Sequence, residues 1–305
     1  MHRTPPLPPG ETGLVLLLRL LSRLPLPLLY GLADLAWLLV WKLGRWKRAL
    51  TLDNLRSSFP HRDERELARI ASAAWRNALD VLFETLHGRH MRADALRARV
   101  QFENPGQMNE LLERHGRVLA VAAHQGNWEW LEMASSLVMP APLVTLYKPL
   151  NHPGAERFLN DIRERFGGRM VPARHALREL LPFTRRGGIV ALLADQGPQP
   201  GEEKYWTDFL GRETAFYPGV EKLARRLRMP LLFTRVTRRG RGHYQVRFEL
   251  LAEYPEQLAP GECMARYVRA VEAQVREHPE DWLWMYKRWK YRREPTSISL
   301  SSKRA

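Results

Sequence analysis

Short apolar runs alternate with helical patterns through the middle of this chain, and that alternation constrains its fold more than any other feature. Each run is apolar, shorter than a helix and followed by turn residues, which is typical of buried strands. The three runs cover residues 117–123, 142–147 and 187–195. Helical patterns occupy residues 127–138, with Asn127 in the N-cap position, and residues 154–167, which end at Gly167. Strands and helices in alternation predict an α/β domain with helices layered on a sheet.

The C-terminal half adds a hairpin and a further helix. Two β-rich runs, 230–238 and 243–251, flank the turn sequence Arg-Gly-Arg-Gly. Apolar residues then recur every three or four positions between residues 264 and 275, as they do earlier between residues 63 and 86. Both of these patterns predict helices.

The N-terminus contains a long apolar stretch. Residues 26–43 include only Asp34 and Lys42 as charges and are about as long as a helix that crosses a bilayer. Asp34 at mid-depth costs roughly 2.5–3.5 kcal/mol on an insertion scale. Tryptophan, lysine and arginine follow in residues 41–50, a mixture that suits a membrane interface on the cytoplasmic side. The stretch predicts a membrane anchor, spanning or lying in the interface, and a buried helix of the core is the alternative.

These patterns divide the chain into two parts. Residues 1–48 contain a loose proline-rich start, residues 1–10, and the apolar anchor. Residues 49–305 form one α/β catalytic domain, because no stretch within this range has the composition of a linker. The single cysteine, Cys263, excludes an intramolecular disulfide and a multi-cysteine metal site, and its place in a helical pattern favours core packing.

Polar residues follow the three predicted strands: His124, Lys148 and Asp195. In open α/β sheets, ligands gather outside the carboxyl ends of the strands. His124 is the strongest candidate for chemistry, since a histidine can take a proton from a hydroxyl near neutral pH and a carboxylate can fix its tautomer. Glu129 lies five residues further on, and the two can meet only if the chain bends between them, which Gly126 permits.

Two other interpretations of this stretch compete with the catalytic one. His124 can be a turn residue, with Glu129 serving only the helix dipole. A metal site is the weaker rival, because the spacing lacks the His-Glu-x-x-His pattern and no second histidine stands nearby. The chain also lacks the phosphate-binding loop, the serine nucleophile elbow and the dinucleotide-binding glycine pattern. Nucleotide hydrolysis and serine-hydrolase chemistry therefore have no supporting motif.

The charge of the chain predicts anionic partners. Lysine and arginine number 48 against 33 acidic residues, a formal net charge of +15. Basic clusters in residues 147–169, 225–228 and 284–293 suit phosphate groups on a lipid or the surface of an acidic protein. Basic and aromatic residues together also suit nucleic acid, but no nucleic-acid-binding motif is found. We therefore expect no nucleic-acid partner.

An ordered set of motifs over nearly the whole chain resembles one family. The segments are Thr-Leu-Asp-Asn-Leu-Arg-Ser-Ser-Phe-Pro at 51–60, His-Gln-Gly-Asn-Trp-Glu at 124–129, Tyr-Lys-Pro-Leu-Asn at 147–151, Leu-Leu-Ala-Asp-Gln-Gly-Pro at 192–198, and the tryptophan-rich run 278–290. They resemble the lipid A late acyltransferases, the lauroyl and myristoyl transferases, whose His-x4-Asp/Glu motif falls on His124 and Glu129. One departure is Tyr286, where many relatives have histidine.

The resemblance implies an inner-membrane enzyme whose catalytic domain faces the cytoplasm. Such enzymes move an acyl chain from acyl carrier protein onto a hydroxyl of a lipid A precursor. The implied fold is like that of the glycerolipid acyltransferases, a mixed sheet flanked by helices, here preceded by a membrane-associated helix. We expect no cofactor and no metal, only an acyl-carrier-protein thioester or acyl-CoA as donor substrate. Expected partners are acyl carrier protein, an anionic glycolipid and the membrane.

We assign expected roles to six residues. His124 is the general base and Glu129 the carboxylate that orients it. A backbone N–H near Gly126 and Asn127, or an arginine, meets the oxyanion. The candidate substrate contacts are Asn127, Lys148, Arg165 and Asp195. Another glycolipid, an aminolipid or a lysophospholipid is the alternative acceptor, and a basic membrane adaptor is the alternative without enzyme activity. Acyl chain length, acceptor position and oligomeric state have no signal in the sequence.

Overall fold

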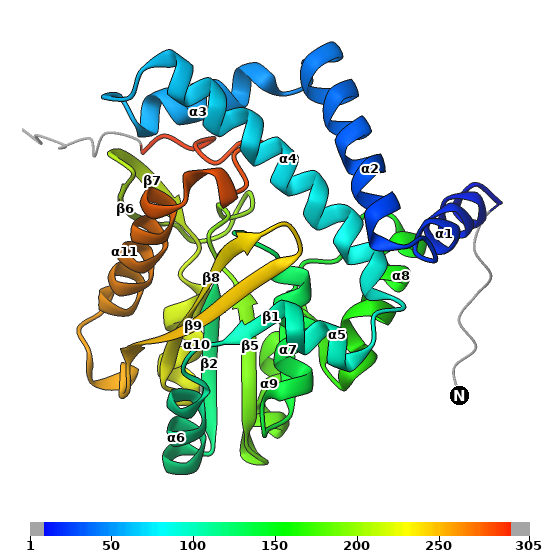
Figure 1. The fold of residues 1–305 in the computed structure, drawn as a ribbon. Coiled ribbons are helices and arrows are strands. Elements are labelled where there is room, and N and C mark those ends of the chain that lie inside the picture. The colour runs from blue at the N-terminus through cyan, green and yellow to red at the C-terminus, as the bar shows by residue number, and fades with distance from the viewer. Residues whose placement is uncertain (1–8, 294–305) are drawn as a thin grey trace, which may run out of the picture.

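The computed structural model describes residues 9–293 (Figure 1), so most of the expected loose proline-rich start lies outside the described residues. Its centre is a seven-stranded sheet in the order β1-β9-β8-β2-β5-β3-β4. All neighbouring strands run parallel except β8 and β9, which form an antiparallel hairpin. The strand bounds are β1 Val100–Phe102, β2 Arg117–Ala122, β3 Leu143–Tyr147, β4 Arg169–Pro172, β5 Gly188–Leu193, β8 Leu231–Gly240 and β9 His243–Ala252.

The central strands are apolar on both faces because helices cover both sides of the sheet. In β2, Val118 and Ala120 pack into one apolar core and Leu119 and Val121 into the other. This is the alternation that a pleated strand imposes on its side chains. The sheet thus separates two cores, each closed by its own helices.

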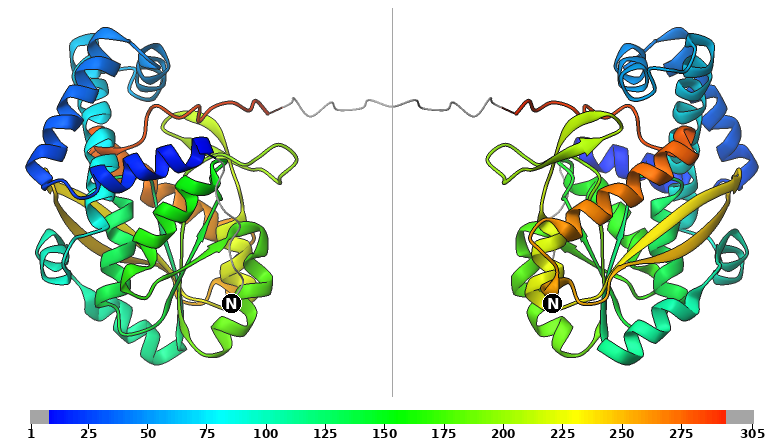
Figure 2. Two further views of the ribbon diagram at one scale, coloured as in Figure 1. Left: turned by 90° about the vertical axis from the view of Figure 1, so that its right-hand side faces the viewer. Right: turned by 90° about the vertical axis from the view of Figure 1, so that its left-hand side faces the viewer.

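On one face of the sheet lie four helices: α5 Ala93–Arg99, α6 Pro105–His115, α7 Trp128–Val138 and α8 Pro153–Arg163. The opposite face is covered by α9 Ala176–Arg185, α10 Gly219–Leu227 and α11 Glu262–Glu277, with α3 Arg48–Ser58 and the long α4 Glu64–Gly88 across the top (Figures 1 and 2). The predicted α/β architecture, a mixed sheet flanked by helices, is confirmed.

Helix ends follow their local sequence. Asp63 caps α4 by accepting a hydrogen bond from the Glu66 N–H, and Asn127 caps α7 by accepting from the Trp130 N–H at 2.8 Å. After α8, a short 3-10 turn, Glu164–Phe166, ends at Gly167 in the left-handed conformation, φ 95°. The helix bounds expected around Asn127 and Gly167 are therefore close to those observed.

Four strands had no clear signal in the sequence. β1 and β4 have three and four residues, and β6 Tyr205–Phe209 with β7 Arg212–Phe216 forms a separate two-stranded hairpin. This small hairpin packs on the tryptophan-rich end of the chain, where Phe209 contacts Trp282 and Trp289.

The N-terminal segment forms helices that lie against the domain. α1 Pro9–Leu21 packs on α8, and α2 Leu26–Trp37 packs along α4 (Figure 2). α2 continues into a π-helical segment, Leu38–Leu43, and together they make one helix long and apolar enough to cross a membrane by length and composition. Only 22% of that stretch is buried, so it is not a core helix in the described structure.

Candidate active site

His124 and Asp195 meet at the carboxyl edge of the sheet. Strands β2 and β5 pair in parallel register with Ala122 opposite Leu193, so the residues two positions beyond each strand come side by side. The His124 Nδ1 atom lies 2.7 Å from the Asp195 Oδ1 atom. The other carboxylate oxygen, Oδ2, accepts a hydrogen bond from the Trp282 indole N–H at 2.9 Å. Because Asp195 engages Nδ1 of His124, Nε2 is the ring nitrogen that can interact with a substrate.

Asp195 is buried, with a relative exposure of 2%. Burial alone would raise the pKa of its carboxyl group, but the charge and hydrogen bond of His124 and the Trp282 N–H hold that pKa below its ordinary value. Asp195 therefore stays ionised and supports a positive charge on the His124 ring. This is the arrangement that a histidine general base requires.

The loop between β2 and α7 turns at Gly126, which has φ 63°. A Cβ atom there would lie 2.8 Å from the Val236 Cγ1 atom, so the position needs glycine for its conformation and for its space. The Gly126 N–H donates to the Asp281 carbonyl at 3.2 Å. It is thus engaged within the protein, which argues against the expectation that it meets the oxyanion.

The carboxylate on His124 is Asp195 and not Glu129, which corrects the expected pairing. Glu129 lies in the first turn of α7 and points towards the end of α8. There the Arg163 guanidinium donates two hydrogen bonds to it, at 2.7 and 2.6 Å. Trp128 Nε1 donates a third at 3.2 Å. The bend at Gly126 does occur, but it brings the His124 ring to Asp195 rather than to Glu129. The ring also packs edge-on against Trp128, the first residue of α7.

A second buried carboxyl group lies one turn further along α7. Glu132 is 8% exposed and accepts a hydrogen bond from the Thr145 hydroxyl on β3. Burial raises the pKa of Glu132 to about 7, while the Thr145 hydrogen bond and the Arg163 charge oppose the shift and nearby Glu129 adds to it. Sequence reasoning did not single out Glu132.

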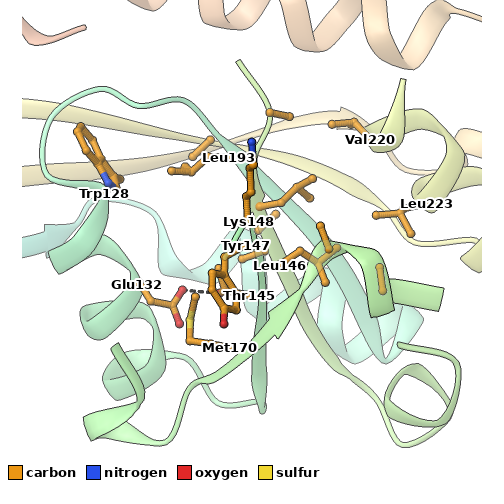
Figure 3. A pocket seen from close by; sticks show the side chains of 18 of the residues that line it. Trp128, Glu132, Thr145, Leu146, Tyr147, Lys148, Met170, Leu193, Val220 and Leu223 are labelled. Carbon is orange, nitrogen blue, oxygen red and sulfur yellow. Dashed lines mark hydrogen bonds between the residues drawn. The ribbon is translucent and has the colours of Figure 1, made fainter. Parts of the chain in front are cut away.

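A large cavity of about 1940 Å³ has His124 among its lining residues. Figure 3 shows part of its lining, including Trp128 and Lys148. Its lining comes from both faces of the sheet, with Glu132 on one side and Val220 and Leu223 of α10 on the other. On the α7 face, apolar side chains follow the strands from their carboxyl ends towards their starts, beside the polar Glu132, Ser135 and Thr145. This part of the cavity wall, here called the α7 arm, is lined by Ala120, Ala122, Leu131, Met139, Leu143, Ile189, Ala191 and Leu193.

The other predicted contact residues have different positions. Lys148 lines the cavity, is exposed, and donates to the Gln199 side-chain oxygen at 2.9 Å, so a substrate can reach it. Asn127 is 1% exposed and donates to the Glu84 carboxylate at 2.7 Å while capping α7. Arg165 donates to the carbonyls of Gly88 and Met91 at 2.5 and 2.9 Å. These contacts give Asn127 and Arg165 structural roles, and neither residue lines the cavity.

Several residues of the site escaped sequence reasoning. Arg163 sat in the same basic cluster as Arg165 without being preferred, and only the three-dimensional contact with Glu129 separates them. Trp282 belongs to the tryptophan-rich run, where nothing marked one indole as a partner of Asp195. Gln196 directly follows Asp195, and its amide nitrogen lies 3.5 Å from His124 Nε2.

Among residues 9–293, no three His, Cys, Asp or Glu side chains gather closely enough to hold a metal ion.

A histidine held by a buried carboxylate beside a large, partly apolar cavity is an arrangement found in α/β enzymes, and it could apply general-base chemistry to a substrate with an apolar chain. Comparison with known proteins identifies the family. Residues 13–291 match the model of the bacterial lipid A biosynthesis acyltransferases, and the chain belongs to this family. It is therefore an acyltransferase of lipid A biosynthesis.

Two curated relatives agree with the family. A lipid A biosynthesis acyltransferase of Haemophilus influenzae is 22% identical over 262 residues, which cover 81% of this chain and 79% of the relative. A lipid A biosynthesis myristoyltransferase of Escherichia coli is 23% identical over 259 residues, covering 83% and 78% respectively.

Proposed function

We propose that this enzyme transfers a fatty acyl chain from the thioester of acyl carrier protein, or of acyl-CoA, to a hydroxyl group of a lipid A precursor. The observation that carries the proposal is the His124–Asp195 pair, 2.7 Å apart, at the mouth of a cavity with an apolar arm. A hydroxyl at the mouth and an acyl chain in the arm would bring both reacting groups to His124.

His124 Nε2 takes the proton of the acceptor hydroxyl while Asp195 balances the charge on the ring. The hydroxyl oxygen attacks the thioester carbonyl carbon and forms a tetrahedral intermediate. When the carbon–sulfur bond breaks, the thiolate takes the proton from His124, so the ester and a free thiol leave. The scheme needs no acyl-enzyme, and the Gln196 amide is a candidate donor for the oxyanion.

The α7 arm suits an acyl chain in length as well as in polarity. From Leu193 to Ile189 along β5 it extends four residues, or about 13 Å. An extended chain advances about 1.25 Å per carbon, as standard C–C bond lengths and angles require, so roughly ten carbons fit beside this part of the wall.

The positive charge of the protein supports two anionic partners in this reaction. A formal charge of +15 favours both acyl carrier protein, expected to be acidic, and a phosphorylated glycolipid. Exposed Lys148 at the cavity is a contact for a phosphate of either substrate. We place the enzyme at the cytoplasmic face of the inner membrane, with residues 1–48 as the membrane segment and residues 49–305 as the catalytic domain.

The proposal is tested by following the mass of a tetra-acylated lipid A precursor incubated with acyl carrier protein loaded with laurate or myristate. The wild type adds one acyl group, and His124→Ala lowers the rate on the order of 10²–10⁴-fold, as the loss of a general base does. His243→Ala, which removes an exposed histidine of the β8–β9 turn, is the matched control and keeps the rate. An unchanged rate in His124→Ala, or transfer only to another lipid, contradicts the proposal.

A further inference from the structure

The N-terminal helices carry an apolar face that the rest of the protein leaves uncovered. More than half of the large apolar side chains that are exposed among the described residues fall between Leu14 and Trp46. On the helix that begins with α2, Leu28, Leu35 and Leu39 are 58%, 50% and 51% exposed. Their spacing of four to seven residues puts them on one side of the helix, which we call the outer face.

The opposite side of the same helix packs on the protein. Leu26, Leu29 and Ala33 recur every three or four residues and are almost fully buried against the domain, largely along α4. The helix thus has one side committed to protein and one apolar side free. A helix that crosses a bilayer alone would instead be surrounded by lipid along its length.

Charged and polar groups fasten α2 to the domain. Asp34 pairs with Arg76 of α4 at 2.8 Å and with Arg241 of the β8–β9 turn at 3.0 Å. Arg241 also reaches Asp80, which is 1% exposed, at 2.5 Å. The Tyr30 hydroxyl donates to the buried Glu84 carboxylate at 2.7 Å. Moving α2 out across a bilayer would break the contacts of Asp34 and Tyr30, take away a partner of the buried Glu84, and put Asp34 into lipid.

The rim of the outer face has the composition of a membrane interface. Arg23 precedes α2, and Lys42 and Lys47 follow it, all exposed. Trp46 is 58% exposed, and the Lys47 ammonium lies 4.7 Å from its ring centre. Tryptophan and lysine side by side are typical of the headgroup region, and the cations complement anionic lipids.

We propose that α1, α2 and the π-helical segment form a platform that lies in one leaflet of an anionic bilayer and does not cross it. The outer face enters the acyl region, the cations contact the headgroups, and the Asp34–Arg241–Asp80 contacts fix the domain to the platform. This proposal rests on the proposed membrane location and adds the arrangement within the membrane.

The arrangement is tested by placing one cysteine on each side of the apolar helix, Arg23→Cys and Lys47→Cys, in separate full-length chains. The native Cys263 is buried, so the background reaction with a membrane-impermeant maleimide is low. We expect both positions to label in inverted membrane vesicles and neither to label in intact spheroplasts, with detergent-solubilised protein as the reference for full labelling.

Labelling of the two positions from opposite sides would overturn the platform while leaving the membrane location intact. Recovery of the chain in the soluble fraction would overturn both. Vesicle binding gives a second readout: with phosphatidylglycerol in the vesicles, Leu35→Ser with Leu39→Ser should weaken binding at least roughly ten-fold. The control Leu250→Ser, an exposed leucine of β9, should not change it, and equal loss in both variants would contradict the platform.

Discussion

Glu129 and Asp195 were both candidate partners of His124, and the directions of their side chains determine which one contacts it. Glu129 is nearer in sequence, but its place in the first turn of α7 points it at Arg163. Asp195 is 71 residues away, but parallel register brings it to hydrogen-bond distance. The sequence signalled His124 and Asp195 separately, as polar residues after buried strands. The sequence did not show that these two residues are partners, because the spacing of residues along the chain does not reveal which strands are neighbours in the sheet.

We predict that the main role of the Glu129–Arg163 pair is to stabilise the fold. The two side chains are 11% and 17% exposed, so Glu129→Gln leaves a largely buried guanidinium with fewer acceptors. We expect the free energy of unfolding in urea to fall by about 3 kcal/mol, the low end of the range for breaking a buried ion pair. The double variant Glu129→Gln with Arg163→Met should recover most of the loss. A Glu129→Gln protein that is fully stable yet inactive would instead give Glu129 a part in the chemistry.

The raised pKa of Glu132 predicts that the free energy of unfolding depends on pH. Because folding raises the pKa of its carboxyl group from 4.5 to about 7, the folded protein holds a proton that the unfolded chain releases at lower pH. Stability from this group is complete below pH 4.5 and is lost as the pH rises through 7. The loss amounts to roughly 3 kcal/mol.

The free energy of unfolding, measured between pH 5 and pH 8, should therefore decrease more in the wild type than in Glu132→Gln. The glutamine cannot ionise and still accepts from Thr145. Parallel curves for the two proteins would contradict the shifted pKa.

At the scale of elements, the loop after β2 determines where the His124 ring points. Gly126 turns the chain, Asn127 starts α7, and the backbone of Gln125 bridges to Trp282. The same tryptophan holds Asp195, so the loop and the strand end are fixed by one residue of the C-terminal segment.

Alanine substitutions at two glycines distinguish the specific role of this loop from the general cost of placing a side chain at a left-handed position. Gly126 and Gly116 have φ values of 63° and 67°, but a Cβ atom meets Val236 only at Gly126, since none of the described atoms lies within 4 Å at Gly116. Alanine should cost about 1–2 kcal/mol at either position for the backbone, and a further 1–3 kcal/mol at Gly126 for the contact. We expect Gly126→Ala alone to lower acyl transfer, measured beside unfolding in urea; equal activity of the two variants would contradict a positioning role for the loop.

Elements with a marked apolar pattern could be predicted from the sequence, and several elements without one could not. The strands at residues 117–123, 142–147 and 187–195 are apolar enough to identify, and the helix caps at Asn127 and Gly167 are local signals. β1 and β4 are too short for any periodicity, and the β6–β7 hairpin is largely polar. Their strand character comes from partners far away in the chain.

At the scale of the whole molecule, function depends on surfaces that no local pattern describes. The cavity takes its lining from strands, from α7 and from α10, so its depth beside His124 appears only in the folded chain. The apolar N-terminus was recognisable, but a spanning helix and one lying in the interface have the same composition. The proposed platform rests on the contacts of Asp34 with Arg76 and Arg241, which join distant elements of the chain.

We propose that His124 acts as a base because Asp195 holds it, and the rate of acyl transfer by the Asp195→Asn variant tests this dependence. Asparagine keeps the size and can still accept from Trp282, but it cannot balance a charged imidazolium and can fix the wrong tautomer. We expect Asp195→Asn to fold and to transfer acyl groups on the order of 10²–10⁴-fold more slowly than the wild type. A folded Asp195→Asn enzyme with the wild-type rate would contradict it.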